Sequence, residues 1–223
     1  MPLPIACLLA LLALAPAAAA AAQPEENPEG GLAAPAVPSI LGAESLQGGS
    51  SVLAWAGYGT VGAAYGQGFT SWDDLVLQAD FDWAYTEFTP SLAWKRPIAW
   101  ASPWTMALRL GLGWYVNLGG TWIHGFNEPD RGLAIQPALI ASTHAGEGLV
   151  AFTVEAPITV TRWRSGGYMV APKAALSFET PLYGDLTMGI DAGLRWRAGA
   201  GGAPSTQGRT DLQLLVLIGH RVL

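Results

Sequence analysis

The stretch WTMALRLGLGWYV, residues 104–116, decides the fold class. Apolar side chains occupy every second position in it, namely Trp104, Met106, Leu108, Leu110, Leu112, Trp114 and Val116. The positions between them carry small or polar residues, with Arg109 in the middle. Because successive side chains of a strand point to opposite faces, this pattern predicts a long strand with one wholly apolar face.

The same alternation recurs along the chain and predicts an all-β fold. It is clear in 73–95, 149–163, 168–180 and 186–197, and weaker in 51–65, 133–143 and 210–222, where both faces are apolar between Leu212 and Ile218. The count is eight strands if 73–95 is one strand with a bulge near Thr86–Glu87, where the apolar row changes from odd to even numbers. Two strands there would make nine, and an even count would then need a tenth strand from 31–49.

The composition favours a β protein whose outer face meets lipid. Hydrophobic residues make up 51% of the chain and charged residues 13%, against about 25% charged residues in ordinary soluble domains. The formal net charge of -6 gives no electrostatic case for a nucleic-acid partner.

The N-terminal region reads as an export signal followed by a tether. An apolar run ends in Ala20–Ala22, which predicts a cleaved signal peptide over 1–22. No Lys or Arg precedes the run, and an uncleaved membrane helix is the alternative. Residues 23–49 are rich in Pro, Gly and Glu and predict a periplasmic tether with at most one short hydrophobic anchor. The single cysteine, Cys7, lies in the expected signal, so no disulfide is expected.

The connections between the expected strands fall into two kinds. Residues 96–103, 145–148 and 182–185 are short turns, whereas 66–72, 120–132 and 198–208 are longer, more polar and expected at the opposite end. Short periplasmic turns and longer outer loops are typical of a closed antiparallel transmembrane β-barrel, expected over 50–223. The alternative, a soluble β-sandwich, is disfavoured because an exposed apolar row of six or seven residues would aggregate in water.

Aromatic spacing supports the membrane interpretation. Trp104 and Trp114 are ten residues apart, which at about 3.3 Å per residue and roughly 40° of tilt spans about 25 Å, the height of a barrel's apolar band. Trp55 and Tyr65 keep the same interval, as do Tyr168 and Phe178. The aromatic belt is expected to comprise Trp55, Tyr65, Trp83, Trp94, Trp104, Trp114, Trp163, Tyr168, Phe178 and Trp196.

The other face of these strands carries the charges. Arg109 lies midway between the two Trp residues of its strand, and Glu155, Lys173 and Asp191 should lie side by side on neighbouring strands. The expected lumen network comprises Asp80, Asp82, Arg109, Glu155, Lys173, Glu179, Asp191, Arg195 and Arg197. Because the bore of an eight-stranded barrel is just filled by side chains, these charges must be paired or hydrated. The hypothesis is a closed, salt-bridged lumen, and the alternative is a narrow ion or small-solute channel.

With these features the chain resembles, over 50–223, the small eight-stranded outer-membrane barrels of Gram-negative bacteria. The resemblance is architectural and implies contact with outer-membrane lipid and lipopolysaccharide, and insertion by the barrel-assembly machinery. Such barrels commonly end in an aromatic residue, whereas this sequence ends in GHRVL with His220 in the expected outward row.

Little in the sequence indicates catalysis or metal binding. Small barrels that act on lipid A or phospholipids use a His with a Ser, and here Ser142 and His144 share one face without a third orienting group. We therefore expect a structural or surface-interaction role, no enzyme activity, no cofactor and no metal centre. Asp73–Asp74 and Asn127–Asp130 would hold Ca²⁺ only weakly, and a loop at 120–132 could present Trp122, Ile123 and Phe126 to a partner or cap the barrel mouth.

Overall fold

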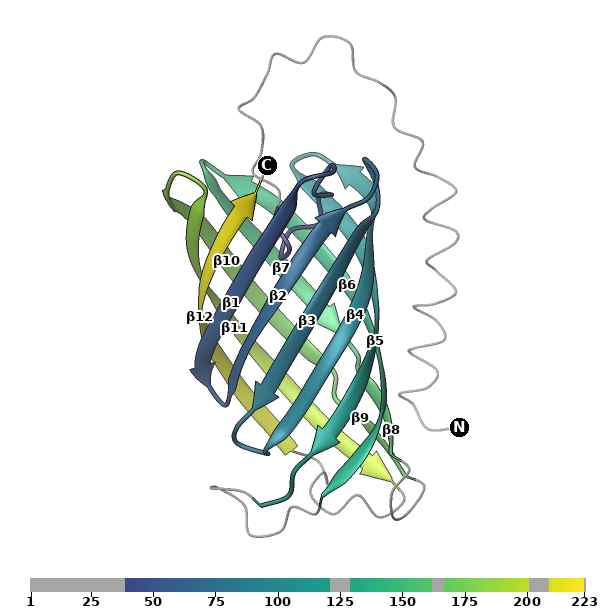
Figure 1. Cartoon of the computed structure of the whole chain (residues 1–223). Coiled ribbons are helices and arrows are strands. Elements are labelled where there is room, and N and C mark those ends of the chain that lie inside the picture. The colour runs from purple at the N-terminus through teal and green to yellow at the C-terminus, as the bar shows by residue number, and fades with distance from the viewer. Residues whose placement is uncertain (1–38, 121–128, 162–166, 201–208, 223) are drawn as a thin grey trace.

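The computed structural model describes residues 39–120, 129–161, 167–200 and 209–222, and these form a closed antiparallel β-barrel (Figure 1). Its strands are β1 (Ser50–Tyr58), β2 (Thr60–Gly68), β3 (Asp74–Asp82), β4 (Glu87–Ala101), β5 (Trp104–Asn117), β6 (Asp130–Ala145), β7 (Gly148–Glu155), β8 (Ile158–Thr161), β9 (Tyr168–Val170), β10 (Lys173–Tyr183), β11 (Leu186–Ala200) and β12 (Arg209–Val222). No helix in this described part of the chain is long and apolar enough to span a membrane.

These segments make ten barrel strands, because prolines divide two of them. β7 and β8 are parts of one strand interrupted at Ala156–Pro157, and β9 and β10 are parts of the next, interrupted at Ala171–Pro172. Proline has no N–H to donate to the ladder, and at the break the Ala171 N–H donates to the Pro157 carbonyl at 3.0 Å. β1 pairs with β12, which closes the cylinder and leaves no free sheet edge among the described strands.

The all-β barrel is confirmed, but the count of eight strands is wrong and the alternative of ten fits. Residues 51–65 contain parts of two strands, β1 and β2, joined at Gly59, whose φ of 86° suits glycine. Residues 73–95 also contain two, β3 and β4, joined by a turn over 83–86. The change from odd to even apolar positions near Thr86 therefore marks a turn, not a bulge, and the tenth strand does not come from 31–49.

The two ends of the barrel differ. The turns at 69–73, 102–103, 146–147 and 184–185 lie at the upper end in Figure 1, together with the start of β1 and the end of β12. The expectation that the 66–72 connection lies opposite the other short turns is wrong, because the extra turn at 83–86 reverses the chain once more. The lower end carries Gly59 and 83–86, and the strands flanking 121–128, 162–166 and 201–208 also end there.

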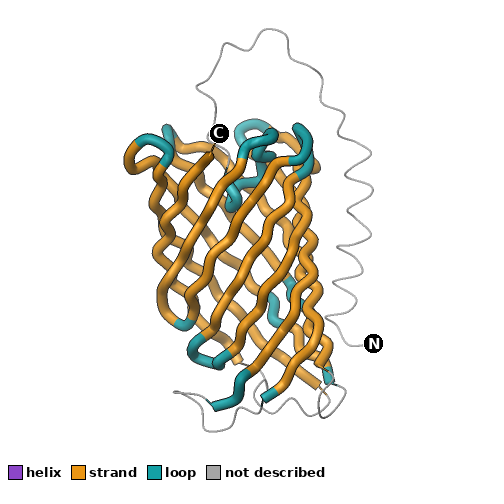
Figure 2. The backbone as a smooth tube through the Cα atoms, in the orientation of Figure 1, coloured by secondary structure: helices purple, strands orange, loops and turns teal. Residues whose placement is uncertain are grey.

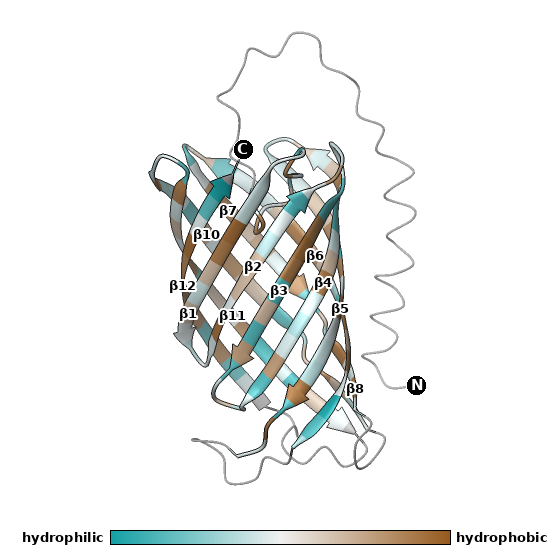
Figure 3. Cartoon of the chain, in the orientation of Figure 1, coloured by the Kyte–Doolittle hydropathy of each residue, from teal (hydrophilic) through white to brown (hydrophobic). Residues whose placement is uncertain are grey.

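The strand faces alternate between a mainly apolar exterior and a mixed interior. On β5, Leu110 and Leu112 are exposed, whereas Ala107 and Tyr115 are buried. On β12, Leu212, Leu214, Val216 and Ile218 point outward while Leu215 and Leu217 are buried, so strand pairing resolves which of its two apolar faces lies inside. Figure 3 shows hydrophobic and hydrophilic residues mixed along the strands.

Residues 39–49 lie inside the upper end of the barrel, in the loop drawn within the strands in Figure 2. Ile40, Ala43 and Leu46 are buried there, and Ile40 packs in a cluster with Leu53 and Trp55 of β1. This segment is the described part of the region expected to be a tether. An eight-stranded barrel is just filled by its own side chains, so ten strands leave room for such an insertion.

Candidate functional site: the barrel lumen

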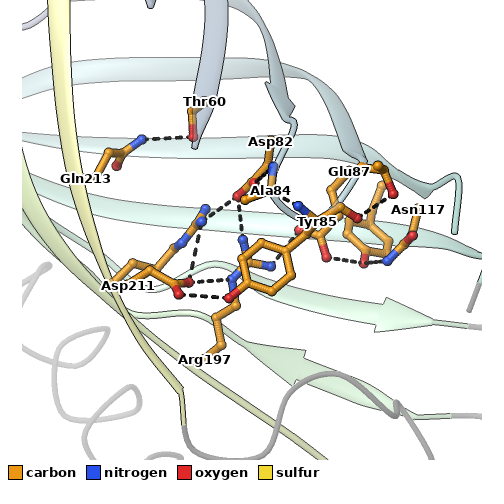
Figure 4. Close-up of polar contacts among 12 residues, drawn as sticks. Thr60, Asp82, Ala84, Tyr85, Glu87, Asn117, Arg197, Asp211 and Gln213 are labelled. Atoms are coloured by element: carbon orange, nitrogen blue, oxygen red, sulfur yellow. Dashed lines mark hydrogen bonds and ion pairs between the residues drawn. The ribbon is translucent and has the colours of Figure 1, made fainter. Parts of the chain in front are cut away.

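The lower part of the lumen contains a cluster centred on Arg197 of β11 (Figure 4). Its guanidinium forms ion pairs with Asp82 at 2.6 Å, Glu87 at 2.6 Å and Asp211 at 3.1 Å. The same group lies 3.9 Å from the centroid of the Tyr85 ring. Only 2% of the Arg197 side chain is exposed, so one buried guanidinium pairs with three carboxylates from three strand ends.

Neighbouring groups complete this lower cluster. Arg195 forms ion pairs with Asp82 and, at 3.7 Å, with Asp211. The Tyr85 hydroxyl donates to Asp211 and the Tyr115 hydroxyl donates to Glu87, both at 2.8 Å. Because a carboxylate offers several acceptor sites, these bonds satisfy the oxygens that Arg197 leaves free.

A second group of charges lies at mid-height. Arg109 on β5 pairs with Glu155 on β7 at 2.8 Å. Lys173 on β10 lies between two acids, 4.0 Å from Glu155 and 3.7 Å from Asp191. Asp191 also accepts a hydrogen bond from Ser177 at 2.7 Å. The structure thus brings Glu155, Lys173 and Asp191 together across three adjacent barrel strands, with alternating sign.

Two other acids from the expected network have different surroundings. Glu179 lies near the upper end, where it accepts hydrogen bonds from Thr187 and Ser39 and is 3.9 Å from Arg221. Asp80 on β3 accepts a hydrogen bond from the Gln78 side chain at 2.6 Å. None of the described Lys or Arg side chains forms an ion pair with Asp80.

The upper part of the lumen is closed by residues 39–49, which are held chiefly by Lys95 of β4. The fully buried Lys95 ammonium donates to the carbonyls of Ser39, Gly42 and Glu44, at 3.2, 3.0 and 2.9 Å, and pairs with Asp74 at 3.1 Å. Asp74 in turn accepts hydrogen bonds from the Ser45 hydroxyl and the Leu46 N–H. We call residues 39–49 the plug, since they occupy the mouth of the barrel.

Ser142 and His144 share the inner face of β6, and both meet the plug. The buried Ser142 hydroxyl donates to Glu44 at 3.0 Å and accepts the Ala43 N–H at 2.8 Å. His144 Nε2 lies 3.6 Å from the other Glu44 oxygen. The Ser142 hydroxyl is thus turned to the Glu44 carboxylate and not to His144, and both of its hydrogen bonds hold the plug.

Most of the expected aromatic belt lies on the outer face, but Trp55 does not. Outward residues with 40–48% exposure are Tyr65, Trp104, Trp114, Tyr168, Phe178 and Trp196, while Trp83 and Trp94 are partly exposed. The expectation that Trp55 belongs to the aromatic belt is wrong, because Trp55 is buried in the lumen beside Leu53 and Leu217. The ten-residue interval from Trp55 to Tyr65 does not give the height of the apolar band, since the chain reverses at Gly59 between them. Trp163 and the loop residues Trp122, Ile123 and Phe126 lie outside the described residues.

Asp73 and Asp74, considered as weak calcium ligands, are engaged by cations of the protein. Asp73 lies in the upper turn, where it accepts hydrogen bonds from Arg96 at 2.6 Å and from the Trp94 indole at 2.8 Å. The hydrogen bond from Arg96 holds the pKa of Asp73 below its usual range. Within the described ranges no cluster of three His, Cys, Asp or Glu residues is arranged to hold a metal.

Between the plug and the Arg197 cluster lies a cavity of about 190 Å³. Ile40 and Leu41 of the plug line it, as do Arg195 and Arg197 from the lower cluster. Its walls combine the mid-height charges with an apolar surface that includes Trp55 and Leu215. The plug and the Arg197 cluster therefore occupy the two ends of the lumen, and an internal space lies between them.

Several residues of the lumen were not among those expected from the sequence: Glu44, Asp74, Tyr85, Glu87, Lys95, Tyr115, Asp211 and Arg221. The alternation of inward and outward positions along the strands was enough to predict some of these residues. With Leu92 and Trp94 facing outward, Lys95 had to face inward. The turn at 83–86 hid the role of Tyr85, and the two apolar faces of the last strand hid Asp211.

Comparisons of the chain with known protein families, with curated proteins and with solved structures give no match. The fold and the lumen therefore define the class of this protein by themselves. It is a ten-stranded closed antiparallel β-barrel with an internal plug and a charge-paired interior.

Proposed function

We propose that the protein is an integral outer-membrane β-barrel with a closed lumen, serving a structural or surface-interaction role without catalysis. The observation that carries the proposal is the outer face of the barrel. Large apolar side chains at 38–62% exposure recur on its successive strands, including Leu77, Leu112, Phe152, Leu194 and Leu214. Monomers in water rarely expose apolar patches beyond a few hundred Å², whereas a closed barrel satisfies the backbone in hydrocarbon.

The distribution of outward charge agrees with this proposal. Among the described strand side chains, the exposed Asp, Glu, Lys, Arg and His residues are Arg96, Arg131 and His220. Arg131 and His220 lie close to strand ends, and Arg96 is level with the start of β3, where it pairs with Asp73. Placing an Arg or Lys on the lipid face destabilises a barrel by about 2–4 kcal/mol at the bilayer midplane and by about 0–1 kcal/mol near the membrane interfaces.

The expected location, the outer membrane of a Gram-negative bacterium, rests on the export signal at 1–22 and on this exterior. The barrel would contact outer-membrane lipid and lipopolysaccharide, and the barrel-assembly machinery would insert it. We propose no nucleic-acid partner, no cofactor and no resident metal. A narrow channel for ions or small solutes is the second candidate, and the internal cavity of about 190 Å³ is the observation that favours it.

Conductance across a planar lipid bilayer separates the two candidates. The wild-type barrel should insert without a steady unitary current, because the plug and the Arg197 cluster close the lumen at either end. Insertion is verified independently by co-flotation with vesicles. A steady, ion-selective current from wild-type protein would contradict the closed-lumen proposal and favour the channel.

The Lys173→Glu variant tests whether the mid-height charges are structural. Reversal places a third carboxylate beside Glu155 and Asp191, so we expect a loss of about 3–5 kcal/mol of unfolding free energy in vesicles. The control, Glu147→Gln in the exposed 146–147 turn, should stay within about 0.5 kcal/mol of wild type. Unchanged stability together with altered ion selectivity would show that Lys173 serves conduction instead.

A further inference from the structure

One row of residues across the lumen wall combines an aromatic ring with a carboxylate that forms no ion pair with a described Lys or Arg. Trp55 on β1 is paired directly with Gly62 on β2, and Gly62 is paired directly with Asp80 on β3. A Cβ atom added at Gly62 would meet the Trp55 ring at 2.5 Å, so the ring lies over this glycine. Since paired residues on adjacent strands lie about 5 Å apart, the ring over Gly62 is one strand away from Asp80, and both residues line the cavity.

The charge around the cavity is not balanced. The carboxylates that line it are Asp80, Asp82, Glu87, Glu155 and Asp191, and the cations that line it are Arg109, Lys173, Arg195 and Arg197. Each of the four cations pairs with an acid other than Asp80. The Asp80 carboxylate therefore faces the cavity with a hydrogen bond from Gln78 but without an ion pair to a described cation, an arrangement that is costly unless water or a ligand adds to that bond.

The wall beside Asp80 is apolar. Trp55 packs with Leu53, Ala64, Leu215 and Leu217, and Ile40 of the plug covers this cluster from above. The Asp80 carboxylate and this apolar surface thus line the same cavity of about 190 Å³.

We propose that this cavity binds a small organic cation, a primary or quaternary ammonium carrying a compact apolar group. The ammonium would lie against Asp80 and the face of Trp55, where ion pairing and the ring quadrupole both favour a positive charge. The apolar group would rest on Leu215, Leu217 and Ile40. Small carboxylates are disfavoured because the neighbouring cations already have partners. Ca²⁺ is disfavoured because it takes 6–8 oxygen ligands, and Asp80 contributes only two.

The test uses the full-length barrel in detergent micelles, with folding verified by heat-modifiable electrophoretic mobility. Benzylamine is titrated calorimetrically, with benzyl alcohol and benzoate as neutral and anionic counterparts of similar size. Because both ends of the lumen are closed, a parallel sample is refolded in the presence of each compound. We expect binding of benzylamine and little binding of the other two.

Two variants assign the site. Asp80→Asn keeps the shape and removes the charge, and should weaken benzylamine binding at least about tenfold. Trp55→Leu keeps an apolar side chain and removes the ring, and should weaken it about fivefold. Glu147→Gln, which removes an exposed turn carboxylate, is the matched control and should leave binding unchanged.

Equal affinity for benzoate or benzyl alcohol, or unchanged benzylamine binding in folded Asp80→Asn, would overturn the proposal. So would the absence of binding to folded wild-type protein, including the co-refolded sample, which would assign the Asp80 charge to water or a small inorganic ion. That result leaves the membrane proposal intact, since vesicle insertion is measured without the amine.

Discussion

Arg197→Met is expected to lower the free energy of unfolding of the barrel by about 3–5 kcal/mol. Arg197 has 2% of its side chain exposed and pairs with Asp82, Glu87 and Asp211. Methionine fills much of the volume but leaves Asp82 and Asp211 with Arg195 as their remaining cation, and it removes the cation that pairs with Glu87. Removing one partner of a buried ion pair is costly because the other partner stays desolvated. Urea-induced unfolding in lipid vesicles, followed by tryptophan fluorescence, measures the loss.

Two companion variants make this prediction specific. Arg96→Met removes a pair with Asp73 at 47% side-chain exposure, and should change stability by at most about 1 kcal/mol. Arg197→Lys keeps the charge but loses the branched guanidinium that reaches three acids, so it should fall between wild type and Arg197→Met. Equal stability of the Arg197→Met and Arg96→Met variants would show that the lower cluster does not hold the barrel together.

Lys95→Met is expected to release the plug. Lys95 provides the cation for Asp74 and three hydrogen bonds to plug carbonyls, and its side chain is fully buried. Without it, the Asp74 carboxylate and these carbonyls lose their donor. The plug retains its hydrogen bonds to Ser142, Asp74 and Glu179 and the apolar contacts of Ile40, Ala43 and Leu46. Glutamyl endopeptidase should then cleave after Glu44 at least about tenfold faster than in wild type, a difference that mass spectrometry would quantify.

The double variant Lys95→Met/Asp74→Asn serves as the control. It removes the uncompensated carboxylate but still lacks the three hydrogen bonds, so the barrel should recover stability while Glu44 stays accessible. If the single variant is cleaved no faster than wild type, Lys95 does not retain the plug, and its other hydrogen bonds and its apolar contacts suffice to hold it.

Alternation alone predicted the fold class and the facing of most long strands. Leu110 and Leu112 face outward and Arg109 inward because period two is a local property of the backbone. The predicted number of strands was wrong because of two segments. One is rich in glycine, and in the other the apolar positions change from odd to even; in both, the sequence does not distinguish a tight turn from a bulge. Gly59 reverses the chain within a stretch that still alternates loosely.

The lumen was predictable in composition but not in contacts. Arg197 had to face inward, yet which acids meet it depends on ladder register and on the turn at 83–86, and both are fixed only by the closed barrel. The plug could not be predicted from periodicity, because its position depends on single, non-local contacts such as those of Ser142 and Lys95. Trp55 was wrongly assigned to the outer face because the turn at Gly59, which also caused the error in the strand count, was not recognised.

The central claim, that the apolar exterior faces hydrocarbon, is tested most directly by nitroxide accessibility along β5. Single cysteines are introduced at each position from 105 to 113 in a Cys7→Ser background, spin-labelled and refolded in lipid vesicles. Labels at Met106, Leu108, Leu110 and Leu112 should collide often with oxygen and rarely with a water-soluble nickel complex, whereas the intervening positions should show low oxygen accessibility. High accessibility of the outward labels to the nickel complex would contradict the account, because it would place that face in water.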